Sequence, residues 1–119
     1  MTRILVITPD TNAARTIRSA WNDGETTTAA TLEEAGSIIE GGAIEYAFID
    51  IEQLRALSTG DHGGDFLSAF HALLPGARAI VMSSPDGIRE AVNLVHEGAS
   101  DYLTYPLVRD EVELVRRTV

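Results

Sequence analysis

Short apolar runs rich in β-branched residues recur along the chain, each followed by apolar residues at helical spacing. The clearest runs are residues 3–8, 46–51 and 77–82. Runs of this kind are typical of strands buried on both faces of a parallel sheet. Parallel strands need a long crossover connection, usually a helix. The pattern therefore predicts a parallel sheet with helices on both faces.

Two weaker runs complete the expected sheet. Residues 25–30 are rich in threonine and suit a strand near a sheet edge, and residues 102–104 form a short strand before Pro106. Thr31 and Glu34 have the spacing of a capping box that opens a helix, and Gly98 is a helix stop. Five strands alternating with five helices predict an α/β fold, a three-layer αβα flavodoxin-like sandwich with strand order 2-1-3-4-5.

The stretch after Asp50 is expected to differ from the other connections. Residues 51–63 include a glycine-, serine- and aspartate-rich segment, and their composition predicts a surface loop. A helix should follow, with an inner face made of Phe66, Leu67, Phe70, Leu73 and Leu74.

Composition limits the possible functions. The 119 residues suffice for one domain, and a net charge of −9 argues against direct contact with nucleic acid. The chain has no cysteine, which excludes disulfides and thiolate metal sites, and all nine basic residues are arginine, which excludes Schiff-base chemistry. The start lacks the features of a secretory signal, and no apolar run approaches the roughly 18 residues that span a bilayer. We expect a cytoplasmic domain without membrane contact.

Polar side chains follow the predicted strands at the carboxyl end of the sheet. Asp50 ends the third strand and Ser83 ends the fourth. The carboxyl ends of parallel strands meet at one edge, where ligands bind in such folds. The groups expected to converge there are Thr8, Pro9, Asp10, Asp50, Ser83, Tyr105 and Pro106.

These positions resemble the receiver domain of two-component response regulators, and the resemblance covers essentially all of residues 1–119. The matching segments are residues 4–7, Asp50, residues 80–84 and residues 98–107. The last segment, Gly-Ala-Ser-Asp-Tyr-Leu-Thr-Tyr-Pro-Leu, is the most specific. Receivers normally carry lysine where this chain has Tyr105.

The resemblance implies a role for each matching residue. Asp50 corresponds to the phosphoacceptor, Ser83 to the switch hydroxyl and Tyr102 to the switch aromatic residue. The family also needs two adjacent acidic residues to hold Mg²⁺ and a lysine to pair with the phosphoryl group. Here Thr8 and Pro9 stand at the acidic pair.

The chain thus lacks half of the family's phosphorylation machinery, since Tyr105 also replaces the lysine. Asp10 lies one residue beyond the acidic pair, and with Asp50 and Glu52 it is a weak metal-ligand candidate. No metal is expected unless the site works, and no cofactor is expected otherwise.

Each candidate residue also has a plainer interpretation. Asp50 is either a phosphoacceptor or a carboxylate that caps nearby amides. Ser83 is either the switch hydroxyl or, with Ser84, a cap of the next helix, and Tyr102 is either the switch aromatic or a half-buried edge tyrosine.

These observations favour an atypical receiver in phosphorelay signalling, not an enzyme, with Mg²⁺-dependent phosphorylation impaired or lost. We expect it to be the N-terminal part of a longer regulator. The resemblance implies contact with an output domain, or a homodimer, through the fourth helix, the fifth strand and the last helix: residues 88–98, Tyr102 and a stripe of Val108, Val112, Val115 and Val119.

Two alternatives remain. One is a conventional receiver phosphorylated on Asp50 by a histidine kinase. The other is a small-molecule or flavin-binding domain, although residues 8–12 lack the phosphate loop that such a site needs.

Tyr105 offers a structural test of the atypical interpretation. Its side chain must either fold over Asp50 or turn outward onto the rim of the sheet. We predict that it folds over Asp50 and holds the domain in one conformation. A neutral phenol can donate a hydrogen bond there, but it cannot neutralise a phosphoryl group.

Overall fold

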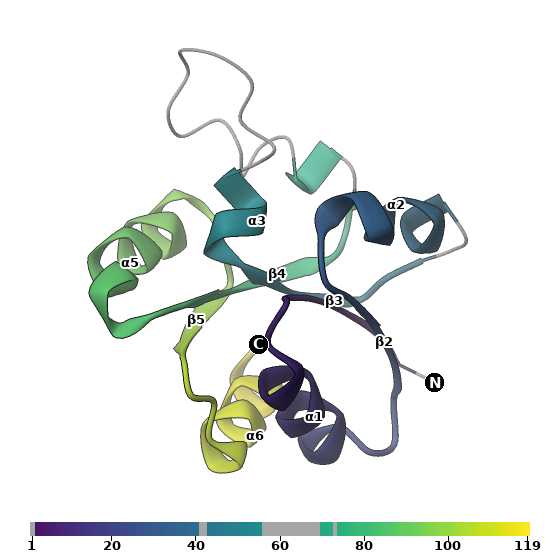
Figure 1. Ribbon diagram of the computed structural model, residues 1–119, viewed down its shortest axis with the longest axis horizontal. Helices are drawn as coiled ribbons and strands as arrows, with labels where there is room; N and C mark the ends of the chain where they lie inside the picture. Colours follow the sequence, from purple (N-terminus) through teal and green to yellow (C-terminus); the bar gives the residue numbers. More distant parts are fainter. Residues whose placement is uncertain (1, 41–42, 56–69, 73) are drawn as a thin grey trace.

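The computed structural model describes residues 2–40, 43–55, 70–72 and 74–119. Its centre is a five-stranded parallel sheet in the order β2-β1-β3-β4-β5, which confirms the predicted order (Figure 1). The strands are β1 (Arg3–Ile7), β2 (Glu25–Ala29), β3 (Tyr46–Asp50), β4 (Arg78–Ser83) and β5 (Asp101–Thr104).

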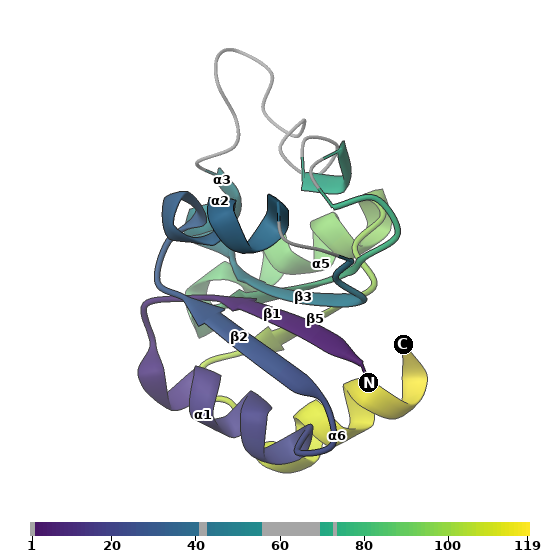
Figure 2. The same ribbon diagram turned by 90° about the vertical axis from the view of Figure 1, so that its right-hand side faces the viewer.

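Helices cover both faces of the sheet. The pair α1 (Thr11–Ala20) and α6 (Arg109–Thr118) lies on one face. The other face carries α2 (Leu32–Glu40), α3 (Ile51–Arg55) and α5 (Ile88–Glu97), the last preceded by the 3-10 turn η1 (Pro85–Gly87). Figure 2 shows the same three layers from the side. The predicted αβα sandwich is confirmed.

Helix ends follow the expected local chemistry. The Thr31 hydroxyl accepts the Glu34 amide at 3.2 Å, and the Glu34 carboxylate accepts the Ala30 amide at 2.9 Å. Gly98 ends α5 with a φ of 135°, a left-handed value that side chains disfavour.

The prediction of a surface loop after Asp50 is wrong for its first five residues, because they form α3, which begins directly at Ile51. Ile51 and Leu54 are three residues apart, so they lie on one helix face, and both are buried. Burial of this pair in the core explains why the chain turns helical there. Phe70 and Leu74 of the next predicted helix are buried too. The rest of the expected loop, 56–63, and Phe66, Leu67 and Leu73 lie outside the described residues.

The core has one half on each face of the sheet. Successive strand residues alternate, so Phe48 joins the α1–α6 side while Ile49 joins the α2–α3–α5 side. Trp21 is buried against Phe48, with ring centroids 6.0 Å apart. The structure thus buries the apolar runs on both faces, as the sequence pattern indicated.

Arginine contacts hold α6 in place at its C-terminal half. The Arg116 guanidinium lies 5.2 Å from the Trp21 ring, donates to the Ala20 carbonyl at 3.3 Å and pairs with Asp23. Arg78 on β4 donates to the Val119 carbonyl at 3.3 Å. These contacts join α6 to α1 and to the base of the sheet, so α6 forms a fixed wall for the surface beside β5.

Candidate functional site

Asp50 lies at the carboxyl end of the central strand β3 and is 9% exposed. The neighbouring strand β1 brings Thr8 to the same edge, and the segment after β5 brings Tyr105. One carboxylate oxygen, Oδ1, accepts the backbone amide of Glu52 at 2.8 Å. This bond satisfies that oxygen at the start of α3, as the capping interpretation of Asp50 predicted.

The Tyr105 side chain folds over Asp50, as predicted from the sequence. Its hydroxyl donates to Asp50 Oδ2 at 2.6 Å and lies 2.8 Å from Thr8 Oγ1. A phenol has one proton, so with that proton given to Asp50 it accepts from the Thr8 hydroxyl. Thr8 Oγ1 in turn accepts the Asp10 amide at 3.1 Å. A hydrogen-bonded row therefore runs from β1 through Tyr105 to Asp50, and we call Thr8, Tyr105 and Asp50 the tyrosine bridge.

The environment keeps the Tyr105 phenol neutral. Burial is the largest cause that raises the pKa of this phenol, followed by its hydrogen bond to Asp50. The Asp50 charge raises the pKa further, while the bond from Thr8 lowers it. Tyr105 is therefore a proton donor to the carboxylate at neutral pH and supplies no positive charge.

The residues at this edge fit a Mg²⁺ ion poorly. Mg²⁺ in proteins is held by oxygen ligands, usually with one or two carboxylates among them, and the two positions after β1, Thr8 and the exposed Pro9, supply no carboxylate. The Asp10 carboxylate instead caps α1, with Oδ1 accepting the amides of Asn12 and Ala13 at 3.0 and 3.1 Å. Within the described residues, no three His, Cys, Asp or Glu side chains gather as a metal site would require.

Ser83 lies beside the tyrosine bridge but points elsewhere. Its side chain is 1% exposed, and its hydroxyl donates to the Ser84 carbonyl at 3.1 Å. The alternative in which Ser83 and Ser84 cap the next helix is not seen, since η1 begins at Pro85 and its N-cap residue, Ser84, makes no side-chain cap hydrogen bond. The Ser83 carbonyl accepts the Tyr105 amide at 2.9 Å, which links the end of β4 to the bridge.

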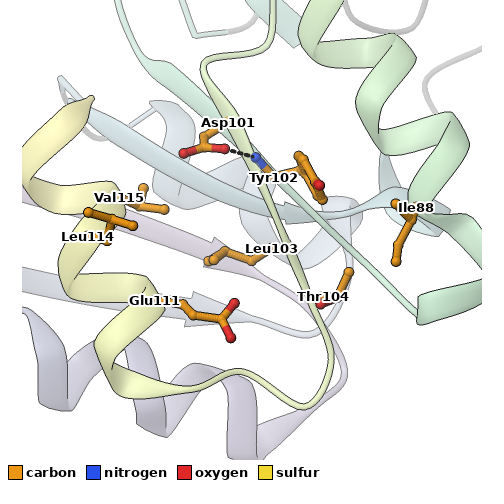
Figure 3. A pocket seen from close by; sticks show the side chains of 8 residues that line it. All are labelled: Ile88, Asp101, Tyr102, Leu103, Thr104, Glu111, Leu114 and Val115. Carbon is orange, nitrogen blue, oxygen red and sulfur yellow. Dashed lines mark hydrogen bonds between the residues drawn. The ribbon is translucent and has the colours of Figure 1, made fainter.

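Tyr102 lies on β5 beside Val81 of β4, and it lines a surface groove. The groove has a volume of about 290 Å³ and lies between α5, β5 and α6, as Figure 3 shows. Tyr102 is partly exposed and packs against the core on the α5 side. We call this the α5–β5–α6 groove; its lining residues are Ile88, Asp101, Tyr102, Leu103, Thr104, Glu111, Leu114 and Val115.

Apolar side chains stand open to solvent along this groove. Ile88 is 39% exposed and Leu114 is 57% exposed, and each comes from a different wall. Glu111 and Asp101 add negative charge. The contact face expected from the resemblance lies on the same elements, but Val112 and Val115 of its valine stripe are buried, and Glu111 and Leu114 were not expected there. The sequence signal for Leu114 was its position as an apolar residue just outside the valine stripe.

Comparisons with known proteins agree with this architecture, although no protein-family model matches the chain. The alginate biosynthesis transcriptional regulatory protein AlgB of Pseudomonas putida is 25% identical over 114 residues, 94% of this chain. The probable transcriptional regulatory protein y4xI of Sinorhizobium fredii is 29% identical over 105 residues, 87% of this chain. The chain spans only 24% of AlgB and 44% of y4xI.

Solved structures extend the comparison. A response regulator of Thermotoga maritima superposes with a TM-score of 0.79 at 17% identity, covering 98% of this chain and 95% of that one. A response regulator receiver domain protein of Methanospirillum hungatei gives a TM-score of 0.71 at 25% identity, covering 98% and 92%. The resemblance that the sequence motifs indicated is confirmed. Among the described residues, no helix has the length and apolar character needed to cross a membrane.

Proposed function

We propose that this chain, a receiver domain of the response-regulator type by fold and by sequence similarity, is an atypical receiver in phosphorelay signalling that acts through protein contacts. In this proposal, Mg²⁺-dependent phosphorylation of Asp50 is impaired or lost. Asp50 keeps the place of the phosphoacceptor, Ser83 that of the switch hydroxyl and Tyr102 that of the switch aromatic residue. The domain has no enzymatic activity of its own and works in the cytoplasm.

One observation carries the proposal: the 2.6 Å hydrogen bond from the Tyr105 hydroxyl to Asp50 Oδ2. Charge-assisted bonds of this kind are stronger than those between neutral groups. A phosphoryl group on Asp50 would have to displace the phenol, break its bond with Thr8 and then find no cation in its place. Phosphoryl transfer depends on neutralising the charge of the transferred group, and Tyr105 supplies no charge.

The proposed partner surface is the α5–β5–α6 groove. Its exposed Ile88 and Leu114 have no partner to bury them within the described part of the chain, and apolar surface of this kind marks interaction sites. The curated relatives are named as transcriptional regulators and are longer than the matched stretch. By analogy, we place the domain ahead of an output region, which it controls through this groove, or in a homodimer through the same groove.

A thermal-shift measurement with Mg²⁺ and beryllium fluoride, a mimic of the phosphoryl group, tests the proposal. Ligands that bind only the folded state raise its melting temperature. We expect no shift for the wild-type chain and none for Asp50→Asn. A clear upward shift in the wild type that Asp50→Asn abolishes would show a working site and favour the conventional receiver.

A further inference from the structure

A second groove lies at the other edge of the sheet, between α1 and β2. Its volume is about 240 Å³. This α1–β2 groove is lined by Thr11, Ala14, Arg15, Arg18 and Thr28. The lining residues of α1 are three or four positions apart, so they form one stripe along the helix that faces β2. The groove shares no residue with the tyrosine bridge or with the α5–β5–α6 groove.

Within the described part of the chain, the positive charge in this groove has no carboxylate partner. Arg15 and Arg18 are exposed, and neither pairs with a described carboxylate, unlike Arg109, which pairs with Glu113, and Arg116, which pairs with Asp23. The whole chain carries a net charge of −9. Arg15 and Arg18, one helical turn apart, therefore form a local positive patch on an acidic domain. Such an arrangement favours an acidic ligand.

The strand beside the arginines has an open edge. Among the described strands, β2 pairs with β1 alone, and the Glu25 amide and the Ala29 carbonyl point toward that neighbour. Because backbone groups alternate in direction along a strand, those of Thr26 and Thr28 point outward. Arg18 Nη2 lies 3.5 Å from the Thr26 carbonyl, which places this guanidinium over the open edge.

We propose that the α1–β2 groove binds an acidic segment of a partner protein in extended conformation, which adds to β2 as an outer strand. Open strand edges bind extended peptides through backbone hydrogen bonds. Side chains two positions apart in such a segment lie about 6.8 Å apart on one face. Arg15 and Arg18 lie about one turn, roughly 5 Å, apart along α1, so alternate carboxylates reach both.

A peptide fits these features better than a nucleic acid does. The outward carbonyls of this strand edge bond only to hydrogen-bond donors, which a peptide backbone supplies and a phosphate backbone lacks. The net charge of −9 also repels long polyanions. A short acidic strand places its charge only where the two arginines are.

Fluorescence anisotropy with a labelled synthetic peptide of alternating glutamate and valine tests the proposal. We expect binding that weakens as NaCl rises from about 50 to about 500 mM, because salt screens exposed charges. A matched peptide with lysine in place of glutamate should not bind. Replacing both arginines, Arg15→Gln with Arg18→Gln, should weaken binding roughly tenfold. The control pair Arg89→Gln with Arg117→Gln makes the same change of charge on exposed positions of α5 and α6 and should leave binding unchanged.

A further variant tests the backbone hydrogen bonds that the added strand would form with β2. Thr28→Pro removes an outward amide of β2 and should abolish binding while the melting curve shows a folded domain. If this variant does not fold, amide chemical shifts of the wild type settle the same point. They should move at Thr26 and Thr28 when the glutamate peptide is added. Equal binding of the lysine peptide, an equal loss in the control pair, or shifts confined to the α5–β5–α6 groove would overturn the proposal.

Discussion

The tyrosine bridge and the α5–β5–α6 groove are neighbours along β5, yet they differ in how their side chains are satisfied. At the bridge, Asp50, Thr8 and Tyr105 bond to one another, and each is at least partly buried. In the groove, Ile88 and Leu114 remain open to solvent. Internal pairing at the first surface and exposed apolar area at the second are what we expect of the proposed domain, which acts through contacts and not through chemistry at Asp50.

The difference has a physical cause in one residue. A lysine in place of Tyr105 would bring a cation to Asp50. That cation could pair with the oxygens of an added phosphoryl group. The phenol brings a neutral donor, and burial raises its pKa so that it stays neutral. The bridge is therefore complete without any ligand. In the groove, by contrast, a partner that buries the apolar side chains would bind with favourable free energy.

The largest expected effect comes from rebuilding the phosphorylation site. The triple variant Thr8→Asp, Pro9→Asp and Tyr105→Lys should accept a phosphoryl group from a small phosphodonor at millimolar Mg²⁺, because it restores the metal carboxylates and the cation. Tyr105→Lys alone should not, since the metal ligands are still missing. Intact-mass spectrometry measures the adduct. Phosphorylation of the single variant at the level of the triple variant would show that Tyr105 alone closes the site.

A charged substitution in the α5–β5–α6 groove should weaken self-association or the docking of an output region. Leu114→Asp places a charge among the apolar lining residues and should raise the dimer dissociation constant at least about 30-fold, the equivalent of about 2 kcal/mol. Sedimentation equilibrium measures it. Val108→Asp is the matched control, because Val108 is 49% exposed, lies outside the groove lining and precedes α6, where an aspartate is tolerated as a cap. Equal loss in both variants would show that net charge, not the groove, controls association.

Removing the Tyr105 hydroxyl should destabilise the domain. Tyr105→Phe removes the donor to Asp50 Oδ2 and the acceptor of the Thr8 hydroxyl proton, which should lower the free energy of unfolding by about 1–3 kcal/mol. Urea unfolding measures the change. Tyr46→Phe is the matched control, since its hydroxyl bonds mainly at the surface, to Arg78 at 2.8 Å, and should cost about 0.5–1 kcal/mol. A smaller cost for Tyr105→Phe than for Tyr46→Phe would argue against the bridge.

Alkaline pH should produce the smallest effect. The raised pKa of Tyr105 means that the folded chain keeps this proton where the unfolded chain begins to lose it, near the ordinary tyrosine value of 10.0. Its contribution to stability is therefore present below that pH and is lost as the pH rises further. Urea midpoints measured at about pH 8 and about pH 10.5 should fall more for the wild type than for Tyr105→Phe. Identical falls in the two proteins would contradict the raised pKa.

Much of the fold could be predicted because the pattern of apolar residues repeats over whole elements. Each buried strand fills a continuous run, and helix ends carry their own signals, as Glu34 and Gly98 do. The five-residue helix α3 could not be predicted in the same way, since it is too short to show a period. Only the spacing of Ile51 and Leu54 hinted at it.

The sequence predicted which residues lie at the site better than it predicted the hydrogen bonds between them. The carboxyl edge of the parallel sheet brings Thr8, Asp50 and Tyr105 together, and the Tyr105 ring was expected over Asp50 because it stands at the lysine position of the family. The bond between Thr8 and Tyr105 joins residues 97 positions apart, and nothing local encodes it. The direction of the Ser83 hydroxyl likewise depends on backbone geometry after β4, which the sequence alone does not specify.

Intact-mass spectrometry of the wild-type chain tests the central claim, that the tyrosine bridge closes Asp50 to phosphorylation, most directly. The chain is incubated with a small phosphodonor and millimolar Mg²⁺, with the triple variant as the positive control and Asp50→Asn as the negative control. The account predicts no phosphoryl adduct on the wild type under conditions in which the triple variant is modified. A wild-type adduct that disappears in Asp50→Asn would contradict it.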